Sequence, residues 1–232
     1  KQLHTFSANN LSQKSYNISK LMDIASERNV DKDKIAIFFN SAQHVDYGGD
    51  DPDWDNYWHS GLVIQEGRVL RNEPNINKSQ ASFVGLDNEN NLLFFNYKSK
   101  TPDSKTNAGR KTQFNQFINS GVKNNLQVYS NSVTNGVPES GDTKSAWQGF
   151  CQIDKNNYVH IVIDPDHRKV YTLKQFADMF IDQGCTEAWR TDGGGSNIVK
   201  IKKANTTSLS NYIYPDNDGP RYLWNTLYWS EL

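Results

Sequence analysis

The chain has 232 residues, a formal net charge of -1 and 12% aromatic residues. That length buries one good-sized core, so we expect one domain or two closely fused halves. The near-neutral charge gives no basic field for nucleic acid or an anionic membrane, and no apolar run approaches the roughly 20 residues of a membrane span. The N-terminus has neither an initiator Met nor the apolar core of a signal peptide. We expect a processed product or a part of a larger protein.

Two cysteines occur, Cys151 and Cys185. Two cysteines in a chain this long make no disulfide scaffold, and no Cys/His spacing indicates zinc. Both lie in apolar stretches, which favours buried free thiols. A single disulfide is the alternative, so the redox compartment stays open.

The first half of the chain predicts one helix and several strands. Apolar residues at helical spacing predict a helix over 16–29, and the apolar run 34–39 predicts a buried strand. Two hairpins follow, each made of two apolar runs around a polar turn: 61–65 with 68–70, and 81–86 with 92–97. The polar stretch 98–110 contains Pro102 and Gly109 and is predicted to be a surface loop.

The second half echoes the first. A short helix is predicted around Phe114 and Phe117, ending at Gly121. The clearest helix runs over 172–183, because Thr172 and Gln175 have capping-box spacing ahead of one apolar stripe. Strands are predicted at 126–133, 147–153, 158–163, 186–190, 197–201 and 222–228. Helices among antiparallel hairpins give an α+β class with two similar halves. We expect an N-terminal segment with its helix at 1–33 and a domain at 34–232, in one compact unit.

A run of glycines provides the first candidate site. Asp192, Gly193, Gly194, Gly195 and Ser196 come directly after a predicted strand. Consecutive glycines let backbone N–H groups turn toward an anion without obstruction from Cβ atoms. The adjacent aspartate could act as general acid or base, or hold a sugar hydroxyl. A tight turn between two strands, capped by the aspartate, is the alternative with about even weight.

An arginine near the C-terminus is the second candidate. Arg221 follows Asp218, Gly219 and Pro220, and Asn225 comes shortly after. A guanidinium at the start of a strand can bind a phosphodiester through two hydrogen bonds. A surface turn with a solvated arginine is the alternative, and composition alone favours it.

An acidic loop at 46–56 is the third candidate. It could bind a divalent cation such as calcium through Asp51, Asp53 and Asp55, although it departs from the EF-hand pattern and a solvated loop is the favoured interpretation. Trp58 could stack on a sugar face. His44 and His59 flank the loop, and either has a pKa suited to proton transfer near neutral pH.

The order of these motifs resembles the phosphodiester glycosidase family. The resemblance covers about residues 34–229 and rests on four stretches in the family's order: the hairpin Gly61–Leu70, the pair of strands from Phe150 with the helix from Thr172, Asp192–Ser196, and Asp218–Leu227. Family members cleave the bond between the anomeric carbon of a sugar and a phosphate. The resemblance therefore implies a glycosyl phosphodiester substrate.

The chain departs from the family pattern at three places. The family's N-G-G-F-F is represented only by Asn40 and the residues after it. Gln148 stands where the family has an arginine. Two residues before Asp192, Arg190 replaces the family's asparagine. Side chains two residues apart in a strand share a face. We hypothesise that Arg190 supplies the phosphate-binding charge that Gln148 does not.

The resemblance implies roles for the candidate residues. Asp192, Arg221 and His59 are the expected catalytic residues, and the second carboxylate could be Asp46, Asp154 or Asp218. The expected substrate-binding residues are Arg190, Gly193, Gly194, Gly195, Ser196, Asn40, Gln148, Asn225 and Trp58. We expect a carbohydrate or glycosyl-phosphate polymer such as teichoic acid as partner, and an extracellular, cell-surface or virion location such as a phage tail. A non-catalytic carbohydrate-binding module and a metal-dependent hydrolase are the alternatives.

Overall fold

A computed structural model of the chain describes residues 2–7, 35–40, 61–73, 82–89, 91–95, 106–128, 144–155, 157–163, 170–191, 197, 199–202, 209–213 and 225–230. Within these ranges the strands pair antiparallel, in four sheets, and two helices accompany them. The predicted α+β class is therefore confirmed.

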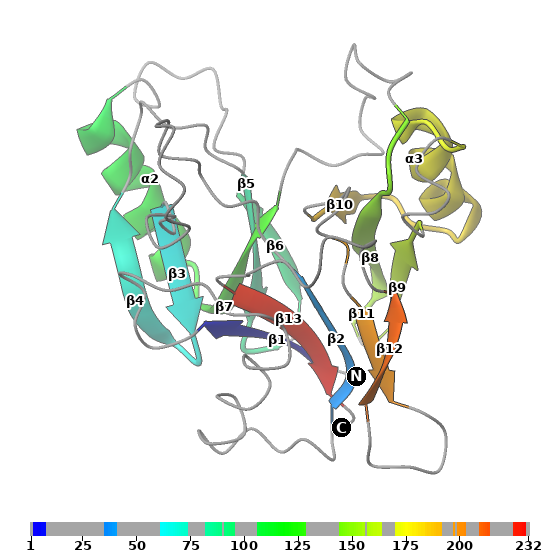
Figure 1. The fold of residues 1–232 in the computed structure, drawn as a ribbon. Helices are drawn as coiled ribbons and strands as arrows, with labels where there is room; N and C mark the ends of the chain where they lie inside the picture. The colour runs from blue at the N-terminus through cyan, green and yellow to red at the C-terminus, as the bar shows by residue number, and fades with distance from the viewer. Residues whose placement is uncertain are drawn as a thin grey trace, which may run out of the picture.

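The largest sheet has five strands and lies below the two helices in the view of Figure 1. Its strands, in spatial order, are β1 (Gln2–Ser7), β13 (Asn225–Ser230), β2 (Ile35–Asn40), β11 (Val199–Lys202) and β12 (Leu209–Ile213). Strand β1 pairs with β13 along its whole length. The sheet thus joins segments from both ends of the chain, and β1 from the segment 1–33 shares it with strands of the predicted domain.

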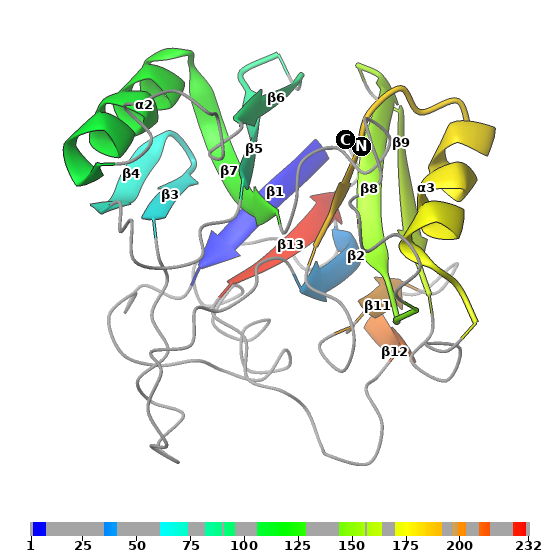
Figure 2. The same ribbon diagram turned by 90° about the horizontal axis from the view of Figure 1, so that it is seen from above.

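The first helix belongs to a region formed by described residues between 61 and 128, which we call the first region. It contains the hairpin β3 (Gly61–Gln65) and β4 (Arg68–Glu73), and a sheet in the order β6 (Leu92–Phe95), β5 (Ser82–Asp87), β7 (Val122–Val128). Helix α2 (Asn107–Asn119) buries Phe114 and Phe117 against side chains of β3 and β7. This region is at the left of Figures 1 and 2.

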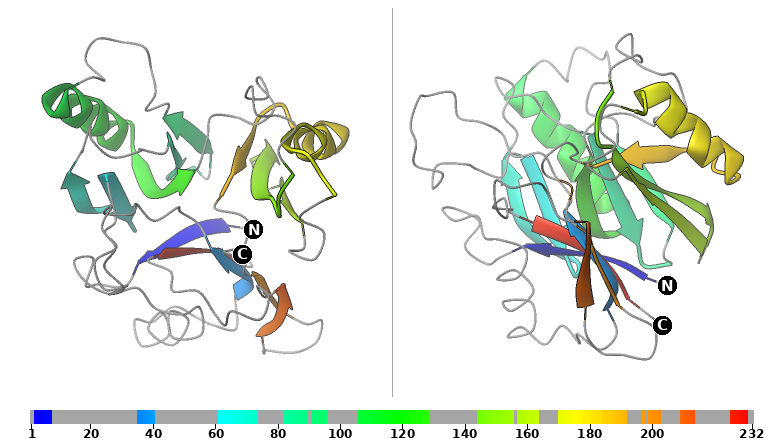
Figure 3. Two further views of the ribbon diagram at one scale, coloured as in Figure 1. Left: turned by 45° about the horizontal axis from the view of Figure 1, so that its top comes forward. Right: turned by 45° about the vertical axis from the view of Figure 1, so that its right-hand side comes forward.

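The second helix belongs to described residues between 144 and 190, which we call the second region. Its sheet has the order β10 (Ala188–Arg190), β8 (Gln148–Asp154), β9 (Asn157–Val162). Helix α3 (Leu173–Asp182) lies beside this sheet at the right of Figures 1 and 2. It buries Phe176 and Phe180 in a cluster with β8 residues. In Figure 3 both regions stand over the five-stranded sheet.

The two faces of the β8 sheet pack against different partners, because successive side chains of a strand point to opposite sides. On one face, Phe150 and Trp189 join Val84 and Leu86 of β5 and Val199 of β11 in a common buried cluster. The other face carries the cluster with α3. The sheet of the second region is therefore the layer between α3 and the rest of the molecule.

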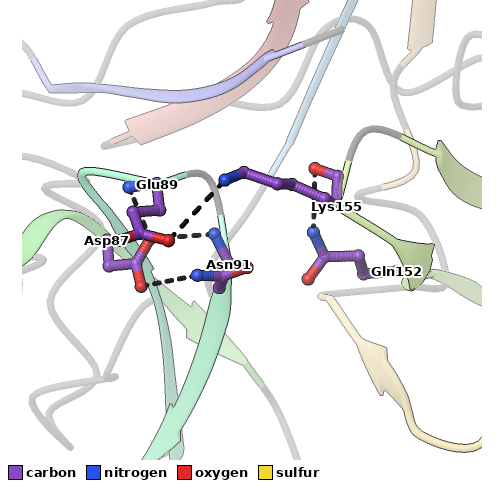
Figure 4. Close-up of polar contacts among 5 residues, drawn as sticks. All are labelled: Asp87, Glu89, Asn91, Gln152 and Lys155. Atoms are coloured by element: carbon purple, nitrogen blue, oxygen red, sulfur yellow. Dashed lines mark hydrogen bonds and ion pairs between the residues drawn. The ribbon is translucent and has the colours of Figure 1, made fainter.

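A polar network also connects the two regions at the tips of their hairpins (Figure 4). Gln152 Oε1 accepts a hydrogen bond from the Leu92 backbone N–H at 2.9 Å, and its amide donates to the Lys155 carbonyl at 3.2 Å. Lys155 pairs with Glu89 at 3.6 Å between exposed side chains. Gln152, which is half-buried, thus joins the β8–β9 hairpin to the first residue of β6.

Asp87 organises the turn between β5 and β6. Its carboxylate accepts hydrogen bonds from the Glu89 and Asn91 backbone N–H groups at 2.8 and 2.9 Å, and from the Asn91 side chain at 3.0 Å. Burial raises the pKa of Asp87, but these hydrogen bonds and the charge of Lys155 outweigh it, and the pKa lies below its ordinary value of 3.8.

Most predicted elements with described residues are confirmed. Strand β2 and both hairpins occur where the pattern placed them, as do strands β8, β9, β10, β11 and β13, and helix α3 has the predicted capping box. The hairpin turn between β3 and β4 has positive φ at Glu66 and Gly67, as a two-residue type I′ turn requires. The predicted helix at 16–29 and the acidic loop at 46–56 lie outside the described residues.

Two predictions about the first region need correction. Helix α2 begins at Asn107, inside the stretch predicted as a loop, because the Thr106 hydroxyl accepts a hydrogen bond from the Gly109 N–H at 3.0 Å and caps the helix. Strand β7 begins at Val122, four residues earlier than predicted. Strands β1 and β12 had no predicted counterpart, because both are polar in sequence and gain their order from pairing with β13 and β11.

Candidate active site

The glycine-rich stretch connects two sheets. Strand β10 of the second region ends at Arg190, and strand β11 of the five-stranded sheet begins at Val199. Residues 192–196 lie outside the described residues, but Thr191 before them and Asn197 after them are described. The geometry of these flanking residues therefore defines where the stretch leaves and re-enters the fold.

Polar residues are buried together at this place. Among the described residues, the buried polar side chains are Gln148, Thr191 and Asn197, each with 0% exposure. Burial of a polar group is unfavourable unless hydrogen bonds compensate it. Thr191 and Asn197 flank the glycine stretch and Gln148 is bonded to Thr191 through its carbonyl, which distinguishes this place from the rest of the described core.

Thr191 is attached to strand β8. Its backbone N–H donates to the Gln148 carbonyl at 2.9 Å, and its hydroxyl reaches the same oxygen at 3.4 Å. The backbone bond follows the pairing of β10 with β8, in which Arg190 lies opposite Gly149. Thr191 thus extends the hydrogen bonding between β10 and β8 by one residue beyond the end of β10.

Asn197 is attached to the end of the β8–β9 hairpin. Its side-chain amide donates to the Ile163 carbonyl at 3.1 Å and to the Trp147 carbonyl at 3.4 Å. The Ile163 N–H donates to that same Trp147 oxygen at 2.7 Å. The Asn197 side chain therefore forms its hydrogen bonds where the pairing of β8 with β9 ends, and it links β11 to the second region.

Arg190 stacks on a buried tryptophan. Its guanidinium carbon lies 4.8 Å from the centroid of the Trp147 ring, and the Trp147 indole N–H donates to the Tyr171 carbonyl at 3.0 Å. A cation over an aromatic face gains about 0.5–2 kcal/mol, depending on its desolvation. A guanidinium donates its N–H groups in its own plane, so an arginine in a cation–π contact can still bind a phosphate through two hydrogen bonds.

Arg190 and Gln148 lie on opposite faces of the sheet. Arg190 is opposite Gly149 in the antiparallel pair, so its side chain shares the face of Gly149, and Gln148 alternates to the other face. Arg190 therefore does not occupy the place of the Gln148 side chain. Its stack on Trp147 puts it instead on the side that bears α3.

Gly149 permits the close approach of β10. A Cβ atom at this position would lie 2.5 Å from the Trp189 carbonyl oxygen and 3.2 Å from the Phe176 ring. No side chain larger than hydrogen fits at that distance from a backbone oxygen. The glycine therefore brings Arg190 and Thr191 next to β8.

The comparisons with known proteins decide the family. The sequence profile of the phosphodiester glycosidases matches residues 35–228, which is most of the chain. The chain belongs to the phosphodiester glycosidase family. It is accordingly a hydrolase, as the sequence predicted, and no curated protein matches it by sequence.

Two solved structures share the fold of this family member. One is the zebrafish N-acetylglucosamine-1-phosphodiester alpha-N-acetylglucosaminidase catalytic domain auto-inhibited by its pro-peptide, with 14% identity and a TM-score of 0.65 over 100% of this chain and 73% of that one. The other is a hypothetical protein from Synechocystis, with 9% identity and a TM-score of 0.60 over 98% of this chain and 56% of that one.

A disulfide stabilises the glycosidase next to this site. Cys151 and Cys185 are bonded, with Cα atoms 6.1 Å apart. The interpretation of buried free thiols is therefore wrong. The cysteines lie 34 positions apart, so no local pattern pairs them, and only the return of the chain through α3 brings Cys185 to Cys151 of β8.

Two titratable side chains lie on the face of β9 that packs toward β5. Burial lowers the pKa of His160 to about 3, so its ring is neutral at physiological pH. Burial, reinforced by the charge of Asp87, raises the pKa of Tyr158 to about 12, although a hydrogen bond from Gln152 opposes the shift. Neither group titrates near neutral pH.

The remaining predicted site residues are placed less fully. The strand positions of Asn40 in β2 and Asn225 at the start of β13 are described, and both strands belong to the five-stranded sheet that β11 enters after Asn197. Outside the described residues lie Asp192, Gly193, Gly194, Gly195, Ser196, Arg221, His59, Trp58, Asp51, Asp53 and Asp55. Their roles stay predictions.

Within the described ranges, no cluster of three or more His, Cys, Asp or Glu side chains is arranged to hold a metal, and no helix is long and apolar enough to cross a bilayer.

Sequence reasoning missed Trp147 and Asn197. Asn197 was taken as the first residue of a strand, although asparagine side chains near turns commonly form hydrogen bonds with the backbone. Trp147 was taken only as strand sequence, and nothing local indicated that Arg190 would stack on it.

Proposed function

We propose that this phosphodiester glycosidase hydrolyses a sugar-1-phosphodiester in a cell-surface glycopolymer such as teichoic acid. Water adds across the bond between the anomeric carbon and the phosphate oxygen, giving a free sugar and a phosphate monoester. The observation that carries the proposal is the junction at Arg190 and Thr191, which leads from a buried strand directly into Asp192 and the glycines.

In this proposal two arginines bind the phosphate and the glycine stretch binds oxygens of the substrate. Arg190, oriented by Trp147, and Arg221 hold the phosphate, while backbone N–H groups of 193–196 stabilise charge in the transition state. Asp192 positions the sugar or transfers a proton. A phosphate leaving group is a weak base, so a strong general acid is less necessary than for an ordinary glycoside.

The disulfide supports the proposed location. Disulfides form and persist in oxidising environments such as the extracellular space and the bacterial periplasm. Cys151–Cys185 agrees with a protein that acts outside the cytosol, where cell-surface polymers are accessible.

The decisive experiment measures release of free sugar from an N-acetylglucosamine-1-phosphodiester and from teichoic acid that carries glycosyl phosphates. Wild type is compared with Asp192→Asn and with Arg190→Ala, and Arg190→Lys is the control that keeps charge but loses the planar fork. We expect turnover by wild type, and a loss of about 100-fold or more for Asp192→Asn, in the range that general acid–base catalysis contributes.

Three results would overturn parts of this proposal. Equal activity of Asp192→Asn removes Asp192 from the mechanism, and unchanged binding and turnover in Arg190→Ala removes Arg190 from phosphate recognition. Binding of the polymer by wild type with no turnover of any glycosyl phosphodiester would instead favour a carbohydrate-binding module.

A further inference from the structure

Trp147 connects strand β10 to the start of helix α3. Its indole N–H donates to the Tyr171 carbonyl at 3.0 Å, and its backbone carbonyl accepts from the Ile163 N–H at 2.7 Å. The guanidinium carbon of Arg190 lies over its ring, 4.8 Å from the centroid. Trp147 is only 6% exposed. The Arg190 side chain is therefore in contact with a residue that the core holds in place.

The Trp147 ring has little freedom, because it also packs against α3. The Phe176 ring lies 6.4 Å from it, between centroids, at an interplanar angle of 32°. Phe176 has no exposed surface and packs edge-on against Phe180 at 5.1 Å. Aromatic pairs at such distances attract each other beyond the burial of their area. Rotation of the Trp147 ring away from Arg190 would therefore disturb the buried side of α3.

The backbone that accepts the Trp147 indole N–H is fixed as well. Tyr171 directly precedes Thr172, the N-cap of α3, which forms the capping box. The Tyr171 carbonyl also accepts from the Ser145 N–H at 3.4 Å, and Lys144 pairs with Thr172 in an isolated β-bridge. The capped end of α3 thus supports the ring on which Arg190 lies.

An aromatic ring suits an arginine that has to bind an anion. Arg190 is the last residue of β10 and is half-buried. An arginine side chain has many rotamers, and ordering it when a ligand binds costs free energy. A contact that orders the side chain beforehand removes part of that cost. A ring provides such a contact through its quadrupole and, unlike a carboxylate, does not neutralise the charge.

We propose that Trp147 is a positioning residue of the glycosidase, whose ring holds the Arg190 guanidinium in place for the substrate phosphate without neutralising its charge. The inference rests on the proposed function, in which Arg190 binds that phosphate. It adds that Trp147 acts only through Arg190 and that the capped end of α3 supports it. Loss of the ring therefore weakens binding of a ligand that carries the phosphate, whereas the chemical step is unchanged.

The variants separate the ring from the packing around it. Trp147→Leu removes the aromatic face, and Trp147→Phe keeps a face but loses the indole N–H. Phe180→Leu is the matched control, because Phe180 belongs to the same buried cluster but packs on Phe176. Arg190→Ala and the double variant Trp147→Leu/Arg190→Ala complete a double-mutant cycle, which measures whether the two residues act together.

The first measurement is kcat and KM on the N-acetylglucosamine-1-phosphodiester, at a temperature at which every variant is folded by circular dichroism. We expect KM to rise about 3- to 10-fold in Trp147→Leu, with kcat within about twofold of wild type. Trp147→Phe and Phe180→Leu should raise KM by no more than about twofold. In the Arg190→Ala background, Trp147→Leu should raise KM no further.

The second measurement observes Arg190 directly by nuclear magnetic resonance. The Nε–H resonance of Arg190 is assigned by its loss in Arg190→Ala, and the ring current of Trp147 should shift it upfield in wild type. It should move downfield in Trp147→Leu and stay in place in Phe180→Leu. Titration with N-acetylglucosamine-1-phosphate should shift this resonance in wild type, and about 3- to 10-fold more ligand should be needed in Trp147→Leu.

Three results would overturn the inference. An Arg190 resonance without the upfield shift in wild type shows that the contact with the ring is absent in solution, whether or not any variant folds. An equal rise of KM in Phe180→Leu shows a general effect of packing. A further rise of KM when Trp147→Leu is added to Arg190→Ala shows that Trp147 does not act through Arg190.

The same experiment tells failure of this inference from failure of the proposed function. If wild type turns over no glycosyl phosphodiester, the proposed function fails, and the titration with the sugar phosphate alone decides whether Trp147 positions Arg190 for a phosphate group. If Trp147→Leu does not fold, Trp147→Met replaces it, because methionine fills the space with a flexible side chain and has no ring.

Discussion

The first and second regions are built from the same parts but held together differently. Each packs one helix beside antiparallel strands, α2 in the first and α3 in the second. Helix α3 has a complete capping box and a continuous buried stripe, and a disulfide follows it. Helix α2 has a single capping bond and buries two phenylalanines. The region that leads into the glycine stretch is thus the one with covalent and close-packed support, as precise positioning of a site requires.

The largest expected difference comes from the disulfide, which only the second region has. Closing a loop of this length stabilises a protein by roughly 4 kcal/mol on chain-entropy grounds. We expect a reductant to lower the melting temperature of wild type by about 8–15 °C. The double variant Cys151→Ala/Cys185→Ala should melt at the reduced temperature with or without reductant. An unchanged melt of wild type on verified reduction of the bond would contradict this.

Two strand glycines sharpen the comparison. A Cβ at Gly149 would meet a backbone oxygen at 2.5 Å, whereas a Cβ at Gly85 would meet side-chain atoms of Phe117 and Val122 at 2.7 Å. Side chains can shift and a paired backbone cannot. We expect Gly149→Ala to lower the free energy of unfolding by about 3 kcal/mol or more, and Gly85→Ala by about 1–2 kcal/mol. Denaturant titration of both variants measures the difference, and a larger loss at Gly85 would reverse the argument.

The free energy of unfolding should also depend on pH through one titratable group in each region, and the two groups act over different pH ranges. The folded-state pKa of His160 is lowered to about 3 from 6.5, so the unfolded chain binds a proton that the folded chain does not, and stability falls as pH drops from about 6.5. The slope is no more than about 1.4 kcal/mol per pH unit. Asp87 also has a lowered pKa, so its contribution is present above 3.8 and is lost only as pH falls below that value.

Two variants test which group causes the loss of stability in each pH range. His160→Leu should flatten the decline in unfolding free energy between pH 6 and about pH 4.5, and Asp87→Asn should leave that range unchanged. Denaturant titrations at several pH values measure both. A decline of the same slope in His160→Leu would show that another group carries the proton.

The helix caps give the smallest expected difference. Thr172 and Gln175 satisfy each other's backbone N–H groups at 3.2 and 2.9 Å, whereas Thr106 caps α2 through one bond. We expect Thr172→Ala to cost about 1–2 kcal/mol and Thr106→Ala about 0.5–1 kcal/mol. Thr→Ser at either position is the control that keeps the cap. Equal losses would show that the reciprocal bond from Gln175 adds nothing.

Local patterns predicted elements wherever one short stretch contained the whole signal. The capping box with its apolar stripe identified α3, and the turn Glu66–Gly67 identified the β3–β4 hairpin. The start of α2 was missed because its first residues, Asn107 to Arg110, are polar and contain a glycine, and they become helical through the Thr106 cap and the packing of Phe114 and Phe117. Strand β1 was missed because its order depends on β13, more than 200 residues away in sequence.

In the candidate site, too, some features follow from a local pattern in the sequence and others only from tertiary contacts. The sequence by itself determined the family, through motifs in a fixed order, and it indicated Arg190 and the glycine stretch because glycines and a neighbouring carboxylate are visible in one stretch. Only the tertiary structure decided that Arg190 stacks on Trp147, that Cys151 bonds to Cys185, and that Asn197 reaches Ile163. Each of these contacts joins residues more than 30 positions apart, and their geometry follows from how three antiparallel strands and α3 pack, which no local pattern encodes.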